Sequence, residues 1–142
     1  MEGTLLGIPS VALSQAFGWA DGAEVPWSTA QTHGPDVLRR LLDAGIPAGT
    51  LVNINFPARR ADAVAGIAVT SQGARNDATV GVEPRVDGRG NPYFWISYRP
   101  QSTEPAVGTD LAALAAGQVS VTPLRLDLTD HGARQALAHA FR

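Results

Sequence analysis

The stretch Gly108–Thr129, GTDLAALAAGQVSVTPLRLDLT, contains the signals of a helix and a strand in close succession. Thr109 stands where the cap of a short helix is expected, and Asp110 follows in the first turn, where a carboxylate suits the positive end of the helix dipole. Gly117 stands where a residue in the left-handed conformation would end that helix. The first half of the stretch therefore predicts a capped helix over Asp110–Ala116.

The second half of the same stretch predicts a strand. The run Val119–Leu124 is short and rich in β-branched residues, and Pro123 is expected to close it. Asp127 and Thr129 follow as candidate caps for a last helix. A helix, a strand and a further cap in a row favour an α/β fold.

Hydrophobic periodicity predicts further strands and helices before this stretch. A helix is expected over Trp27–Ala44, with Pro35 either kinking it or starting its second half. Val80–Tyr98 is typical of a long hairpin, which we expect to reach a partner subunit because isolated two-stranded ribbons are marginal in water. The other expected elements are strands at Pro9–Ser14, Thr50–Phe56 and Gly66–Ser71, a polar connector at Ala58–Ala65 and an amphipathic helix at Asp130–Phe141.

Composition limits the classes of protein to which the chain can belong. Its 142 residues are 44% hydrophobic and 17% charged, which is typical of one ordinary globular domain. A net charge of -2 with scattered arginines argues against a nucleic acid duplex as partner, because phosphate binding needs a concentrated basic patch. The lack of cysteine excludes disulfides, a thiol nucleophile and thiolate metal sites. No apolar run reaches the length of a membrane span and no signal peptide is evident, so we expect a cytoplasmic protein.

No complete catalytic motif is present in the sequence. It contains no HExxH, no GxxxxGKS/T, no GxGxxG after a strand and no GxSxG. Gly108, Thr109 and Asp110 are the best local candidates for contact with a phosphorylated ligand, because a helix N-terminus offers free N–H donors to an anion. A helix cap and nothing more is an equally good interpretation of these three residues.

Several other side chains leave alternatives open. Asn53 and Asn55 fall on one face of their strand and could hold a ligand's phosphate or sugar, but hydrogen bonds to the backbone of a neighbouring loop are the favoured interpretation. Trp19 and Trp27 bracket a loop, and fixing that loop to the core is favoured over lining a substrate cleft. His33 is interpreted as a solvated or capping residue rather than a ligand.

Several motifs occur in the order and spacing that they have in one known family. They are MEG (Met1–Gly3) with GIPSVALS (Gly7–Ser14), LVNINFP (Leu51–Pro57), VTSQGAR (Val69–Arg75), RGNPYFWI (Arg89–Ile96), GTD (Gly108–Asp110), GQVSVTPL (Gly117–Leu124) and DLT (Asp127–Thr129). With these motifs the chain resembles, over nearly its whole length, the C-terminal part of the SurE (survival protein E) family of metal-dependent 5′/3′-nucleotidases. The resemblance implies a Rossmann-type α/β fold that lacks its N-terminal strands and carries a protruding β-hairpin and a C-terminal helix.

The resemblance also implies a divalent cation, Mg²⁺ or Mn²⁺, which polarises the phosphate ester of a nucleoside monophosphate and activates water. In the family an Asp-Asp pair, a Ser and an Asn hold this ion, and all four lie upstream of the segment that corresponds to Met1. No metal ligand and no catalytic residue is therefore assigned in this chain. Because Met1 corresponds to an internal methionine of a family helix, we expect a truncated gene, a mis-called start or a fragment, without hydrolase activity of its own. The residues expected to line the site from this side are Ser14, Gly108, Thr109 and Asp110.

Two functional interpretations follow from the resemblance. In the first, residues 1–142 are the C-terminal part of a single SurE-like domain and belong to a nucleotidase; in the alternative, they are a non-catalytic oligomerisation remnant. In the family the hairpin and the C-terminal helix mediate contacts between subunits, so a homo-oligomer through Val80–Tyr98 and Asp130–Phe141 is expected. Strands such as Val11–Leu13 and Val52–Ile54 are expected to be exposed, and so to invite association, because the N-terminal half would cover them.

Overall fold

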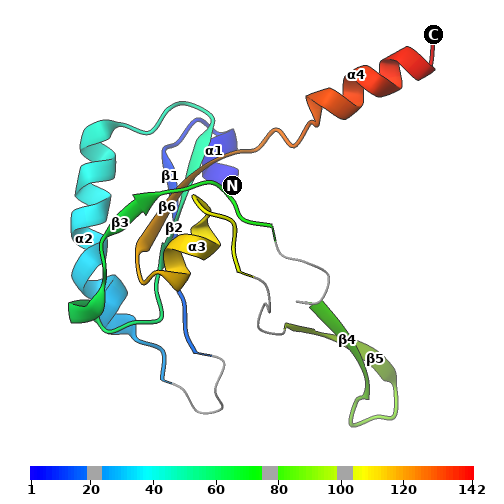
Figure 1. The fold of residues 1–142 in the computed structure, drawn as a ribbon. Coiled ribbons are helices and arrows are strands. Elements are labelled where there is room, and N and C mark those ends of the chain that lie inside the picture. Colours follow the sequence, from blue (N-terminus) through cyan, green and yellow to red (C-terminus); the bar gives the residue numbers. More distant parts are fainter. Residues whose placement is uncertain (19–23, 75–79, 99–103) are drawn as a thin grey trace.

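The computed structural model describes residues 1–18, 24–74, 80–98 and 104–142. Helices and strands alternate through most of the chain (Figure 1), which confirms the predicted α/β class. The helices are α1 (Glu2–Leu5), α2 (Trp27–Ala44), α3 (Asp110–Ala115) and α4 (His131–Ala140), with a 3-10 helix η1 at Ala61–Ala63. The strands are β1 (Ser10–Gln15), β2 (Thr50–Phe56), β3 (Ile67–Val69), β4 (Val80–Val86), β5 (Pro92–Tyr98) and β6 (Val119–Arg125).

Four strands form one mixed sheet in the order β1-β2-β6-β3. β1 and β2 run parallel and are joined through α2, so they make a βαβ unit. β6 pairs antiparallel with β2 and parallel with β3. β4 and β5 form a separate two-stranded antiparallel sheet, which is the predicted hairpin.

The hydrophobic core lies between α2 and one face of the sheet. Val52, Ile54 and Phe56 alternate along β2 and pack with Val37 of α2 and Val119 of β6. Ile54, Phe56 and Val119 have no exposed surface. The expected exposure of the middle of β2 is therefore wrong, because β1 and β6 flank this strand and α2 covers it.

β1 lies at the edge of the four-stranded sheet. Val11 still packs against the core, but Ala12, Leu13 and Ser14 are exposed. Leu13 keeps 47% of its surface accessible. The expected exposure of this strand is thus confirmed beyond Val11. No strand among the described residues pairs with its outer edge, so that edge is a surface to which another strand can add.

The face of the sheet opposite α2 carries polar side chains. Side chains alternate along strands, so the registers put Asn53 beside Thr122, and Ser14 beside Asn55, on this face. The Thr70 hydroxyl lies 2.8 Å from that of Ser120 and 2.7 Å from that of Thr122, and α3 packs over this part of the sheet. The polar residues that the registers put on this face, called the polar face below, are Ser14, Asn53, Asn55, Thr70, Ser120 and Thr122.

Pro123 lies inside β6 rather than closing it, so the predicted end of that strand is wrong. Pro123 pairs with Val52 in the ladder to β2. Its ring nitrogen points to the same side as the Val121 carbonyl, which accepts from Thr70 N–H just after β3 has ended. Because no ladder partner needs an N–H from position 123 on that side, the strand tolerates proline there.

The caps of α3 agree with the sequence. The Thr109 side chain accepts from the Ala112 N–H, and Gly117 has a φ of 76° in the left-handed region just after the helix. α2 continues through Pro35 as a single helix, so Pro35 does not start a separate one.

The cap of α4 differs from the two candidates. Asp130 supplies it, with Oδ1 accepting from the Ala133 N–H at 2.9 Å. Asp127 instead accepts from both the N–H and the hydroxyl of Thr129, which makes a local turn before the helix. The sequence alone does not discriminate among Asp127, Thr129 and Asp130, because all three are residue types that cap helices well.

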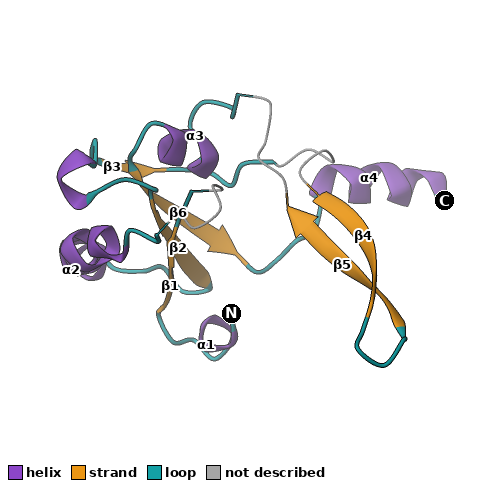
Figure 2. Cartoon of the chain, turned by 90° about the horizontal axis from the view of Figure 1, so that it is seen from below, coloured by secondary structure: helices purple, strands orange, loops and turns teal. Residues whose placement is uncertain are grey.

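The hairpin and α4 project from the body that the four-stranded sheet forms with α2 and α3 (Figures 1 and 2). Every residue of α4 is exposed, including Leu137 at 58%. No helix of the described residues is long and apolar enough to cross a membrane.

Candidate functional site

The carboxyl ends of the parallel strands β1 and β2 lie at one end of the sheet, which is where open α/β sheets bind their ligands. A cavity of about 670 Å³ lies there, between the start of α2 and the segment after β2. Trp27 lines it and is 60% exposed, so the interpretation that Trp27 fixes the loop to the core is wrong. Trp19 lies outside the described residues. The cavity is lined by residues 24–28 and 60–62.

Gln15, the last residue of β1, ties the elements around this end together. Its side-chain amide donates to the carbonyls of Ala16 and Pro57, each at 2.9 Å. Its side-chain oxygen accepts from the Ala30 N–H at 3.2 Å. One side chain therefore holds the end of β1, the end of β2 and the first turn of α2 in a fixed relation.

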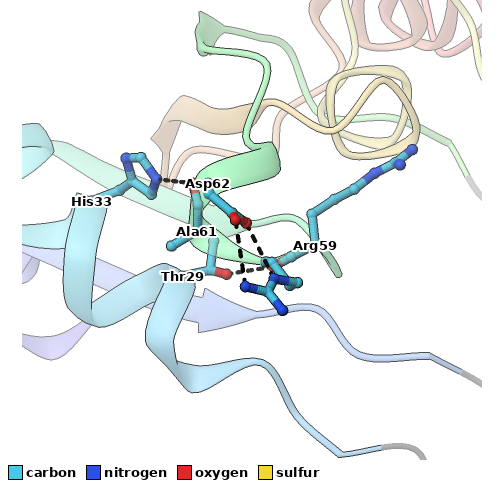
Figure 3. A network of polar contacts seen from close by, with 6 residues as sticks. Thr29, His33, Arg59, Ala61 and Asp62 are labelled. Atoms are coloured by element: carbon cyan, nitrogen blue, oxygen red, sulfur yellow. Dashed lines mark hydrogen bonds and ion pairs between the residues drawn. The ribbon is translucent and has the colours of Figure 1, made fainter.

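Two residues of α2 bind the segment that follows β2 (Figure 3). Thr29 has no exposed surface, and its hydroxyl donates to the Arg59 carbonyl. His33 Nε2 lies 2.9 Å from the Ala61 carbonyl, so this nitrogen carries the proton and donates. His33 is thus a residue that anchors η1, neither a solvated residue nor the helix cap that the sequence suggested.

Arg60 and Asp62 both line the cavity and form an ion pair. Arg60 Nε lies 3.3 Å from Asp62 Oδ1, and the two side chains are 85% and 70% exposed. An exposed pair of this kind contributes little to stability. Because both side chains are exposed, both charged groups are accessible to a charged ligand.

Ser14 and Asn55 lie opposite each other in the β1–β2 register, next to the ends of both strands. Ser14 is exposed and Asn55 is half-buried. Asn53 and Asn55 make no side-chain hydrogen bond with the part of the chain that the structure describes, so the favoured interpretation, bonds to a neighbouring loop, is not found there. Their amides are open to a ligand or to another segment.

Gly108, Thr109 and Asp110 lie at the start of α3, and the N–H groups of that turn already have partners. The Asp110 N–H donates to Ser71 and the Leu111 N–H to the Asp110 carboxylate. The next two N–H groups of the helix donate to Thr109 side-chain and carbonyl oxygens. The free donors that an anion would need are therefore missing, and the geometry favours the capping interpretation.

The four candidate lining residues form two separate groups. Ser14 is near the carboxyl end of β1, whereas Gly108, Thr109 and Asp110 lie beside Ser71, past the end of β3. β3 runs opposite to β1 and is three strand spacings away, about 14 Å. The structure joins the last three residues to one another but does not bring them to Ser14.

The described ranges contain no group of three or more Asp, Glu or His side chains that could hold a metal ion. Asp110 is the only carboxylate among the four candidate lining residues, and its Oδ1 already accepts from the N–H groups of Gly73 and Leu111, each at 2.8 Å. The donor set here does not fit the divalent cation that the resemblance implies, so we derive no step through it.

Sequence reasoning missed three residues of this end of the sheet: Gln15, Thr29 and Arg59. A signal existed for Gln15, since an amide directly after a strand can bond the ends of neighbouring strands. Thr29 looked like an ordinary residue of a helix's first turn, and Arg59 acts through its backbone carbonyl, which no sequence pattern marks.

Residues 1–79, just over half of the chain, match the family described as Survival protein SurE. The chain belongs to the SurE family. Its fold is similar to the crystal structure of the SurE protein from Aquifex aeolicus, with a TM-score of 0.72 and 34% identity over 99% of this chain and 55% of that one. The α/β architecture is thus a SurE fold.

SurE proteins of several bacteria are similar to almost the whole chain. A protein of Azorhizobium caulinodans named 5'-nucleotidase SurE is 55% identical over 141 residues, which are 99% of this chain and 55% of that protein. Proteins of the same name from a Methylobacterium strain and from Rhodopseudomonas palustris are 53% and 54% identical, over 99% and 96% of this chain and 56% and 54% of their own lengths. This SurE chain therefore spans about half the length of the relatives that it matches.

Proposed function

We propose that residues 1–142 are the C-terminal part of a single SurE domain and contribute to a metal-dependent 5′/3′-nucleotidase that hydrolyses nucleoside monophosphates. The observation that carries the proposal is the similarity of 99% of this chain to proteins named 5'-nucleotidase SurE. Mg²⁺ or Mn²⁺ would supply the Lewis acid for ester hydrolysis when bound. We place this activity in the cytoplasm.

The part of the site that this chain contributes is polar and lies at the ends of β1 and β2. Ser14 and Asn55 offer a hydroxyl and an amide on the polar face, and both groups suit the oxygens of a phosphate or a ribose. Gln15 and Thr29 keep the two strand ends and α2 in place around the cavity. We propose that the metal ligands lie outside this chain, so that the isolated chain is inactive.

The alternative is a non-catalytic module for assembly, and the hairpin supports it. In the β4–β5 register, the face with Val82, Phe94 and Ile96 has no charged residue, whereas the other face has Glu83 and Arg85 beside its aromatic residues. Val82, Phe94 and Ile96 are 65%, 73% and 58% exposed. A continuous exposed apolar face of this kind marks an interaction site, and we propose that it binds a second copy of the chain, together with α4.

The DNA directly upstream of the codon for Met1 discriminates between the two proposals. An in-frame Asn-Asp-Asp-Gly stretch would support a complete nucleotidase that includes this chain. A stop codon in that frame would support the assembly module.

A further inference from the structure

Two segments that lie on either side of the hairpin in the sequence meet at the start of α3. Ser71–Gly73 precedes the hairpin and Gly108–Asp110 follows it. The Ser71 N–H donates to the Gly108 carbonyl at 3.0 Å, and the Asp110 N–H donates to the Ser71 carbonyl at 2.9 Å. These bonds form a parallel bridge between Ser71 and Thr109. The chain therefore changes partner here, from β6 at Thr70 to the start of α3 at Ser71.

The Asp110 carboxylate completes this junction. Its Oδ1 accepts from the Gly73 N–H at 2.8 Å and, at the same distance, from the Leu111 N–H.

Gly73 is fitted closely to Asp110 and tolerates no side chain. A Cβ at position 73 would lie 2.9 Å from Asp110 Oδ1 and 2.9 Å from both Cγ and Cδ1 of Leu111. Contacts under 3.0 Å force a shift, and Asp110 and Leu111 are held by the first turn of α3. Even one methyl group at position 73 would therefore move the leading segment away from α3.

We propose that Asp110 is a positioning residue that fixes the root of the hairpin by holding Gly73 against α3. Ser71–Gly73 and Gly108–Asp110 lie on either side of the hairpin in the sequence and meet at this junction, and each bond between them removes conformational freedom from the chain that connects them. The role needs an acceptor oxygen at the Asp110 position rather than a negative charge. In this role Asp110 acts as a structural hydrogen-bond acceptor.

The test compares D110N, which keeps an acceptor oxygen but removes the charge, with D110A, which removes both. Amide hydrogen exchange of Gly73 is measured in the full chain. We expect at least a tenfold faster exchange in D110A and a change of less than about threefold in D110N. D127N, a change in an exposed turn after β6, is the matched control and is expected to leave Gly73 unchanged.

The position of the hairpin gives a second readout that a general loss of stability would not produce. The chain has no cysteine, so spin labels at Q31C, an exposed position on α2, and G88C in the hairpin turn are unique. We expect D110A and G73A to broaden or shift the label-to-label distance distribution and D110N to leave it unchanged. Labelled protein is diluted with unlabelled chain so that only distances within one chain are seen. If D110A does not fold, G73A alone provides this comparison.

Equal Gly73 exchange and equal distance distributions in the wild type and D110A would overturn the proposal, and so would a D110N variant that behaves like D110A. The proposed role of Asp110 at the junction does not depend on the proposed role of the hairpin in assembly. A monomer in sedimentation would therefore contradict the assembly role alone, whereas unchanged exchange would contradict the role of Asp110 alone.

Discussion

Thr29, buried in the first turn of α2, donates its hydroxyl to the backbone carbonyl of Arg59, which follows β2. This bond joins two segments that are 30 residues apart at the carboxyl end of the parallel pair. In the same way, the side chains of Gln15 and His33 donate hydrogen bonds to the backbone carbonyls of Pro57 and Ala61, respectively. The wall of the candidate cavity is thus held by three side chains that each bond a backbone carbonyl.

Replacing Thr29 by Val removes the hydroxyl but keeps the branched shape. The Arg59 carbonyl would then lose its partner, which costs about 1–3 kcal/mol of unfolding free energy. T29S keeps the donor and is the matched control, expected to lose less. Urea denaturation of both variants measures the difference; a T29V protein as stable as T29S would contradict the role of this bond.

The core between α2 and the sheet predicts a large effect at Ile54. Ile54 has no exposed surface, so I54A leaves a cavity and is expected to cost about 2–5 kcal/mol of unfolding free energy. I96A removes the same atoms from a hairpin residue that is 58% exposed and is expected to cost far less. Denaturation midpoints of the two variants provide the comparison, and equal losses would show that the core lies elsewhere.

The two faces of the hairpin are expected to differ in association. Phe94 lies on the apolar face and Tyr93 on the opposite one, and they are adjacent in β5. F94D puts a charge into the proposed interface and is expected to convert the oligomer to monomer in sedimentation velocity. Y93D, with the same charge on the other face, is expected to keep it. A monomeric wild type, or equal effects of both changes, would contradict the assembly role.

The turn of the hairpin is expected to depend on pH through Asp87. Its Oδ1 accepts from the N–H groups of Arg89 and Asn91, each at 2.8 Å. The hydrogen bond from the Asn91 backbone, followed by that from the Asn91 side chain, lowers the pKa of the Asp87 carboxyl. A lowered pKa in the folded state means that Asp87 stabilises the turn above its unfolded pKa, about 3.9, and that this contribution is lost as pH falls through the folded pKa.

Amide shifts of Asn91 followed by NMR from pH 6 downwards measure this titration. Their midpoint is expected below about 3.9, the ordinary value for Asp. In D87N the same amide is expected not to titrate in that range. A midpoint at or above the ordinary value in the wild type would contradict the bonding in the turn.

Local signals in the sequence were sufficient for most of the elements. Thr109 and Gly117 mark the two ends of α3 because a cap and a left-handed residue each require particular chemistry. The hairpin bounds at Val80 and Tyr98 agree with the structure because alternation and a turn of Asp, Gly, Asn and Pro leave little choice. These features depend only on neighbours in the sequence.

Features that depend on sheet order could not be read in the same way. Pro123 inside β6 is tolerated because β3 ends before it, and the burial of β2 depends on its place between β1 and β6. The candidate site shows the same limit. Ser14 and Asp110 are predicted as one group, but β3 runs antiparallel to β1, so the carboxyl ends of these two strands lie at opposite ends of the sheet. Long-range pairing, not local propensity, decides these positions.

Phosphate release by the purified chain tests the central claim most directly. The chain is incubated with 5′-AMP or an aryl phosphate and with Mn²⁺ or Mg²⁺, beside the 5'-nucleotidase SurE of Azorhizobium caulinodans as positive control. Our account predicts release by the relative and none above buffer by this chain. Metal-dependent turnover by this chain, above all turnover that D110N abolishes, would mean that its own carboxylates build a site and would contradict both the account and the structural role of Asp110.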